Sequence, residues 1–267
     1  MIIKKAKKSL GQNFLIDKNI INKIVKIGDI KKDKTVLEIG PGYGNLTKAI
    51  ANMHPKKIYA VEKDKNLVIF LKKNLSFLKN IEIIEGDFMK IFKQRNFNKN
   101  ITVFGNLPYN ISTQILAAFA LQNKWPPWYD SLILMFQKEV ADRIIAKSKT
   151  KAYGRLAVLC NWRFEIKKHF NITKNCFFPK PKVDSTLLSF RPKEIIQFNI
   201  KNPKNLENVT RVLFSNRRKM INKNFAKLFK NSTNVAEELS LNLNNRPEQL
   251  SNEMYYKITI KYENLTN

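Results

Sequence analysis

The stretch Thr35-Val-Leu-Glu-Ile-Gly-Pro-Gly-Tyr-Gly44 joins a short apolar run to a glycine-rich turn, and a helical pattern begins near Asn45. Glycines at a strand-to-helix turn let a ligand approach the backbone closely, and the amino end of the helix faces that ligand. A dinucleotide-binding turn has the spacing G-x-G-x-x-G/A, with a small third residue for helix packing. Here Asn45 takes that third position, and the spacing is E-x-G-x-G-x-G. The turn therefore favours a nucleoside cofactor without a pyrophosphate, with S-adenosylmethionine as the leading case and Gly40 and Gly42 beside it.

Short apolar runs alternate with amphipathic stretches from about residue 35 to residue 190. This alternation is typical of a mostly parallel sheet covered by helices. The expected strands are 35–39, 58–62, 81–85, 101–104 and 132–136, and the expected helices are 46–53, 66–78 and 112–121. The sequence thus predicts a doubly wound, Rossmann-like α/β domain.

The sequence changes in character after Phe190, where prolines punctuate a polar stretch and only helical patterns follow. We place a domain boundary near residue 195, which gives a catalytic domain over 1–195 and a small all-helical domain over 196–267. In the second domain Arg217, Arg218 and Lys219 form a basic cluster that we expect on a helix. Such a cluster is usually a solvated face, but in a nucleic-acid-binding protein it would supply phosphate contacts.

Charge is the strongest signal in the composition: 49 Lys and Arg residues against 21 Asp and Glu residues give a formal net charge of +28. This excess favours a polyanionic partner, but a lysine-rich composition spread over a solvated surface explains it equally well. The two cysteines, Cys160 and Cys176, form neither a disulfide framework nor a zinc pattern, so we expect no metal. No stretch resembles a signal peptide or a membrane span, so we expect a soluble cytoplasmic protein that does not bind membranes.

Two acidic residues follow the next two expected strands. Glu62 closes the second strand, where a carboxylate can accept both hydroxyls of a ribose. Asp87 comes after the third strand and is placed to accept the amine of an adenine. Carboxylates at strand ends are often only solvated turn residues. Here a binding role is favoured because Glu62 and Asp87 follow successive strands after one glycine turn.

The fourth expected strand ends in Asn106-Leu107-Pro108-Tyr109. Ligands bind at the carboxyl ends of strands in such a sheet, so Asn106 should face the same crevice as the cofactor. An adenine amine is a poor nucleophile because its lone pair is delocalised into the ring. If the Asn106 side-chain oxygen and the Leu107 carbonyl accept its two N–H groups, the nitrogen becomes pyramidal and its lone pair points at a sulfonium methyl. Pro108 fixes the turn and Tyr109 can stack on the base; the alternative is a strand-ending turn with a buried tyrosine.

The chain resembles the ribosomal RNA adenine dimethyltransferase family, and most closely its bacterial small-subunit branch. The matching segments are KSLGQNFL at 8–15, EIGPGYG at 38–44, NLPYNIST at 106–113, FQKEVADR at 136–143, KAYGRL at 151–156, FFPKPKVDS at 177–185 and RPEQLS at 246–251. The resemblance implies that Gln12, Asn13 and Leu15 line the cofactor pocket. It also implies that Phe177 stacks on the target adenine opposite Tyr109; without it, Phe177 would be read as a core residue.

The activity implied is transfer of methyl groups from S-adenosylmethionine to N6 of two adjacent adenosines near the 3′ end of 16S rRNA, during biogenesis of the small subunit. The expected partner is ribosomal RNA or the immature small subunit, and we expect a monomer. One alternative is the same reaction on 23S rRNA, as in macrolide-resistance methyltransferases. Another is a non-catalytic RNA-binding, assembly or mitochondrial transcription factor of the same family. A dinucleotide oxidoreductase is disfavoured by Asn45.

Overall fold

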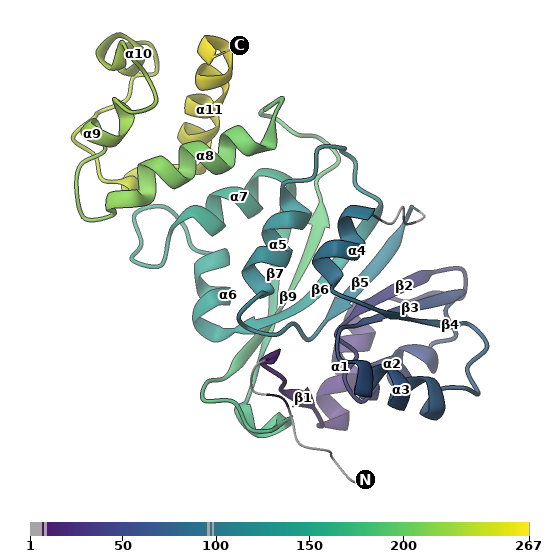
Figure 1. Cartoon of the computed structure of the whole chain (residues 1–267). Coiled ribbons are helices and arrows are strands. Elements are labelled where there is room, and N and C mark those ends of the chain that lie inside the picture. Colours follow the sequence, from purple (N-terminus) through teal and green to yellow (C-terminus); the bar gives the residue numbers. More distant parts are fainter. Residues whose placement is uncertain (1–6, 8–9, 95–96, 98, 267) are drawn as a thin grey trace. The chain divides into compact units, whose positions relative to one another are not determined.

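The computed structural model describes residues 7, 10–94, 97 and 99–266 (Figure 1). We expected no signal peptide at the amino terminus, and most of that stretch lies outside the described residues. Lys8 and Ser9 of the first family motif lie outside them as well. Within the described part of the chain, no helix is long and apolar enough to cross a membrane.

A seven-stranded sheet has the order β4-β3-β2-β5-β6-β9-β7. The five strands from β4 to β6 are parallel, and β9 runs antiparallel to β6. The strands are β2 (Thr35–Ile39), β3 (Lys57–Glu62), β4 (Ile81–Glu85), β5 (Ile101–Gly105), β6 (Tyr129–Gln137), β7 (Phe164–Ile172) and β9 (Ser185–Pro192). The predicted Rossmann-like α/β fold and its five predicted strands are confirmed.

Helices connect these strands and pack on them (Figure 1). They are α1 (Lys18–Ile27), α2 (Asn45–Ala51), α3 (Lys65–Asn74), α4 (Phe88–Gln94), α5 (Ser112–Ala120) and α6 (Lys138–Ile144). Ile24 of α1 and Ile50 of α2 share one buried cluster with Val36 of β2 and Met135 of β6. Alternate residues of a strand point to opposite faces, so this cluster defines the face of the sheet that α1 and α2 cover.

The parallel register brings the carboxyl ends of neighbouring strands to one edge of the sheet. Ile39 of β2 lies beside Val61 of β3 on one side and Gly105 of β5 on the other. Glu62 of β3 lies beside Glu85 of β4. The loops that follow these strands therefore meet at one edge, where ligands bind in open α/β sheets.

A separate two-stranded ribbon, absent from our sequence prediction, pairs β1 (Phe14–Leu15) with β8 (Phe177–Phe178). Leu15 lies opposite Phe177 and Phe14 opposite Phe178, in antiparallel orientation. The ribbon joins the amino-terminal segment to the family motif at 177–185. A two-residue strand leaves no periodic pattern, so its partner cannot be read from the sequence.

The described chain divides into two compact units. The first comprises Met1–Ile115, Pro126–Ala141 and Ile166–Pro192, and the second comprises Leu116–Trp125, Asp142–Glu165 and Lys193–Asn267. Two segments that precede residue 195 thus belong to the second unit, and the functional division into 1–195 and 196–267 stays a prediction.

The second unit has its own core. Its helices include α7 (Arg155–Arg163), α8 (Pro203–Leu213), α9 (Asn222–Phe225), α10 (Ser232–Glu238) and α11 (Asn252–Thr266). Leu206 and Val209 of α8 are buried in one cluster with Val158 of α7 and Ile258 of α11. From Lys193 onward, the described residues form helices and turns.

Candidate active site and cofactor pocket

The glycine turn between β2 and α2 adopts a backbone that side chains would disrupt. Gly40, Gly42 and Gly44 have φ angles of +70°, +59° and +78°, in the left-handed region that favours glycine. A Cβ atom on Gly42 would lie 2.7 Å from the Phe14 ring. The conformation of this turn therefore requires glycine. Gly40 and Gly42 line one pocket together with the predicted binding residues.

Glu62, at the end of β3, bonds directly to the turn. Its Oε2 accepts the Gly42 N–H at 3.2 Å, and its Oε1 accepts the Asp64 N–H at 2.9 Å. Burial raises the pKa of Glu62, and these two backbone hydrogen bonds oppose the rise. Each carboxylate oxygen keeps a further acceptor position for a ligand hydroxyl in the pocket.

Asp87 also lines the pocket, in the loop after β4. Lys63 donates a hydrogen bond to it at 2.8 Å, and the Met89 N–H donates another at 2.9 Å. The hydrogen bond from Lys63 lowers the pKa of Asp87 against the effect of partial burial. Asp87 is thus an ionised acceptor in the lining of the pocket.

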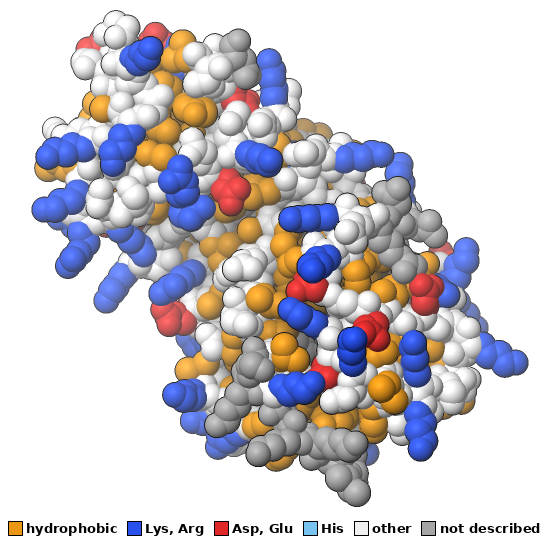
Figure 2. Space-filling view, viewed as in Figure 1, with side chains coloured by type: hydrophobic (Ala, Val, Ile, Leu, Met, Phe, Trp, Pro, Cys, Tyr) orange, Lys and Arg blue, Asp and Glu red, His pale blue; other side chains and the backbone are white. Residues whose placement is uncertain are grey.

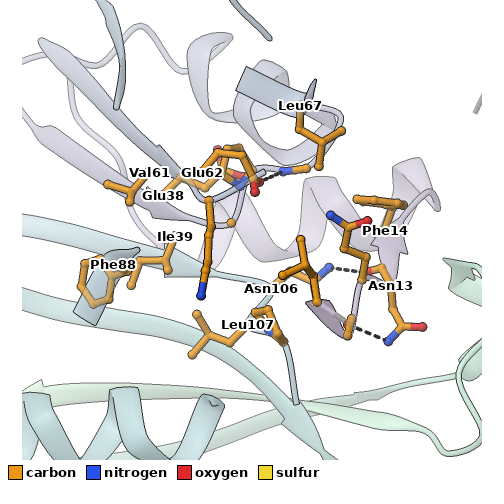
Figure 3. A pocket seen from close by; sticks show the side chains of 18 of the residues that line it. Asn13, Phe14, Glu38, Ile39, Val61, Glu62, Leu67, Phe88, Asn106 and Leu107 are labelled. Carbon is orange, nitrogen blue, oxygen red and sulfur yellow. Dashed lines mark hydrogen bonds between the residues drawn. The ribbon is translucent and has the colours of Figure 1, made fainter. Parts of the chain in front are cut away.

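Glu38 stands in the glycine motif, and no role was predicted for it. The side chain is 2% exposed and lines the pocket beside Glu62. Burial raises the pKa of Glu38 to about 7, and the Glu62 carboxylate adds to the rise. Figure 3 shows the two carboxyl groups on the same side of the pocket. The E-x-G pattern was the sequence feature that could have identified Glu38 as a pocket residue, since it places a carboxyl group at the end of a buried strand.

Asn106 is held by a long-range contact. Its Nδ2 donates a hydrogen bond to the Asn13 carbonyl at 2.8 Å (Figure 3). Because that bond requires the amide nitrogen, the Asn106 Oδ1 is left as an acceptor, and Asn106 lines the pocket. The Asn13 side chain in turn donates to the Gly11 carbonyl at 3.3 Å.

The amino-terminal segment forms one wall of the pocket, which Gln12, Asn13 and Leu15 line. Gln12 donates a hydrogen bond to Asp64 at 3.1 Å, and the Leu15 carbonyl accepts one from Asn45 at 2.9 Å. Asn45, the residue that argued against a dinucleotide turn, thus ties this wall to the first turn of α2. Neither a role for Asp64 nor the contact of Asn45 was predicted.

The remaining residues of the Asn106 loop differ in burial. Leu107 has a buried side chain, while Pro108 and Tyr109 line the pocket in part-exposed positions. The Tyr109 hydroxyl lies 2.7 Å from the Ser185 Oγ. Phe177 is 3% exposed, packs in the cluster that includes Leu15, and is not among the residues that line this pocket. Its stacking role stays a prediction.

The basic cluster lies in a turn after a short 3-10 segment, so its expected helical placement is wrong. The Arg217 guanidinium donates to the carbonyls of Lys151 and Tyr153, each at 2.5 Å. Arg218 and Lys219 are exposed. Arg217 therefore fixes the turn, and the other two present their charges to solvent.

The pocket fits S-adenosylmethionine. The glycine turn admits a close ligand, the acids at the strand ends offer acceptors for a ribose and an amine, and apolar side chains flank them, namely Ile39, Val61, Leu67 and Phe88 (Figure 3). Fold and pocket together define an S-adenosylmethionine-dependent methyltransferase of the Rossmann-like class. A family model described as "Ribosomal RNA adenine dimethylase" matches residues 3–264. The chain belongs to this family and is an rRNA adenine dimethyltransferase.

Curated relatives agree with this family. A protein of Pelagibacter ubique (strain HTCC1062) named "Ribosomal RNA small subunit methyltransferase A" is 51% identical over 261 residues, which cover 98% of each chain. A protein of the same name from Rhizobium johnstonii is 42% identical over 223 residues, covering 81% of this chain and 78% of the relative.

Solved structures show the same fold. A dimethyladenosine transferase from Plasmodium falciparum superposes with a TM-score of 0.78 at 28% identity, over 94% of this chain and 98% of the other. The 23S rRNA methyltransferase ErmE gives a TM-score of 0.68 at 22% identity, over 94% and 99% of the two chains. At that identity the second likeness concerns the fold alone.

Proposed function

We propose that this protein dimethylates N6 of two adjacent adenosines near the 3′ end of 16S rRNA, acting in the cytoplasm as a monomer on the immature small subunit. The observation that carries the proposal is the orientation of Asn106. Its amide nitrogen is bonded to the Asn13 carbonyl, so its oxygen is the group that can accept a hydrogen bond from an adenine amine.

In the proposed reaction, the Asn106 Oδ1 and the Leu107 carbonyl accept the two N–H groups of the target amine. This geometry concentrates the nitrogen lone pair on the side of the transferable methyl group. S-adenosylmethionine, when bound, supplies an electrophilic methyl group on a sulfonium. The Asn106 Oδ1 and the Leu107 carbonyl would hold N6 in line with that methyl group, and the proton that N6 loses on transfer would pass to solvent. Positioning supplies the catalysis, so no side chain has to act as a strong base.

The proposal also assigns roles to the other predicted residues. Glu62 accepts the ribose hydroxyls, and Asp87 accepts the amine of the cofactor's adenine. Gln12, Asn13, Leu15, Gly40 and Gly42 form the walls of the cofactor pocket. Pro108 shapes the turn, and Tyr109 stacks on the target base with Phe177 on its other side.

RNA binding is assigned to exposed basic side chains. Figure 2 shows Lys and Arg side chains distributed over the visible face of the molecule, with fewer acidic ones between them. Arg218 and Lys219 are exposed within the predicted cluster, while Arg217 is bonded to the main chain. We assign phosphate contacts to Arg218 and Lys219, because a mobile exposed cation can neutralise a phosphate without losing another partner.

The test is transfer of radiolabelled methyl to unmethylated small ribosomal subunits, with large subunits and an Asn106→Ala variant in parallel. Products are resolved as modified nucleosides. Dimethyladenosine formed in small-subunit RNA and lost in the variant supports the proposal. Label in large-subunit RNA would favour the 23S reaction, and RNA binding without any label would leave a non-catalytic binding factor.

A further inference from the structure

The stacking residue Tyr109 is held at both of its ends. At the backbone, Ser112 Oγ donates a hydrogen bond to the Tyr109 carbonyl at 3.2 Å. At the tip of the ring, the Tyr109 hydroxyl lies 2.7 Å from Ser185 Oγ, 76 positions further along the chain. Both serines are buried, so a water molecule does not readily replace either of them in its hydrogen bond to Tyr109.

Ser185 is a rigid anchor. It begins β9 and lies opposite Gln137 of β6 in the ladder of the sheet. Its side chain is 0% exposed. A serine has one side-chain torsion to its oxygen, and here the backbone that carries it is fixed by strand pairing. The position of its Oγ is therefore set by the sheet and not by the Asn106 loop.

A bond at the tip of a tyrosine ring fixes where the ring lies. The hydroxyl lies on the axis of the second side-chain torsion, so fixing the backbone and the hydroxyl together sets the first torsion and with it the location of the ring. Tyr109 lines the pocket in a part-exposed position. Stacking depends on where the ring lies, because a base has to rest against the ring face.

We propose that Ser185 is a positioning residue for methyl transfer: it holds the Tyr109 ring at the place in the pocket where the ring stacks on the target adenine. The proposal rests on the proposed function, since it needs an adenine in this pocket. Ser185 touches neither cofactor nor the reacting nitrogen in this scheme. It acts through Tyr109 alone, so its contribution should disappear when the Tyr109 hydroxyl is absent.

The experiment is a double-mutant cycle of Ser185→Ala and Tyr109→Phe, assayed for methyl transfer to small subunits at saturating cofactor. Each single variant should lower kcat about fivefold, as expected for loss of one buried hydrogen bond. The double variant should be no slower than the singles, because both changes remove the same bond. The dissociation constant for S-adenosylmethionine should change less than twofold in all three. Ser185→Thr, which keeps the hydroxyl, should recover most of the rate.

Ser189→Ala is the matched control. Ser189 lies on the same strand, and its hydroxyl bonds the His169 ring at 2.8 Å, away from the Asn106 loop. This variant should keep the wild-type kcat. If Ser185→Ala fails to fold, Tyr109→Phe removes the same bond from the other side and is still expected to be slow.

Three results would overturn the proposal: wild-type kcat in folded Ser185→Ala or in Tyr109→Phe, losses that multiply in the double variant, or an equal loss in Ser189→Ala. Failure of the proposed function looks different, because the wild-type protein itself would then form no dimethyladenosine in small-subunit RNA.

Discussion

Replacing Glu38 by glutamine should stabilise the folded protein at alkaline pH. The side chain is 2% exposed, and its Oε2 has no hydrogen-bond partner among the described residues. Burial raises its pKa from 4.5 to about 7. A buried carboxylate without a full set of donors is costly in its charged form, whereas glutamine keeps the shape and carries no charge.

The sign and size follow from proton linkage. The folded state of wild type keeps a proton on Glu38 that the unfolded chain releases above pH 4.5, so stability falls as pH rises from 4.5 to about 7. The full difference is about 3 kcal/mol, at ~1.4 kcal/mol for each pH unit between the two pKa values. Most of it, about 2.5 kcal/mol, should develop between pH 5 and pH 8. Glu38→Gln does not titrate and should gain that amount relative to wild type over this range.

The assay is urea unfolding of both proteins at pH 5 and pH 8, with free energies compared at each pH. Glu237→Gln on α10 is the matched control, because Glu237 is exposed. A gain for Glu38→Gln that is the same at both pH values, or larger at pH 5, would refute the linkage reasoning. Cofactor affinity gives a second readout. A cationic cofactor favours the ionised Glu38, so affinity should rise from pH 6 to pH 8 in wild type and stay level in the variant.

Two further pairs of variants test the glycine turn and the basic turn. Gly42→Ala should weaken cofactor binding, measured by calorimetry, at least about tenfold. Its Cβ would lie 2.7 Å from the Phe14 ring, at a positive φ. The control is Gly154→Ala, which should bind the cofactor normally because Gly154 has open space around the added Cβ. Arg217→Ala should lower the free energy of unfolding by about 2 kcal/mol, because two carbonyls lose a charged donor. Arg218→Ala should keep the melting temperature and instead reduce the salt dependence of RNA binding by about one unit of slope. An unstable Arg218→Ala or a fully stable Arg217→Ala would contradict the roles assigned to them.

The sequence by itself determined the five parallel strands of the sheet and the position of the pocket, but not the two further strands β7 and β9. Strand periodicity is local, so the five parallel strands could be placed from their apolar runs. The carboxyl ends of parallel strands meet at one edge of a sheet, so Gly40, Glu62, Asp87 and Asn106 could be expected at a common crevice. The structure places all four at the lining of one pocket. These predictions needed only short-range patterns and one rule of topology.

Only the tertiary structure decided how the side chains of that pocket are held. The bond from Asn106 to the Asn13 carbonyl joins residues 93 positions apart, and that between Tyr109 and Ser185 spans 76 positions. Arg217 faces its own main chain from a turn where a helix was expected. Each contact depends on one atom at one distance, and a single long-range hydrogen bond leaves no periodicity in the sequence, so only the folded backbone determines which partners meet.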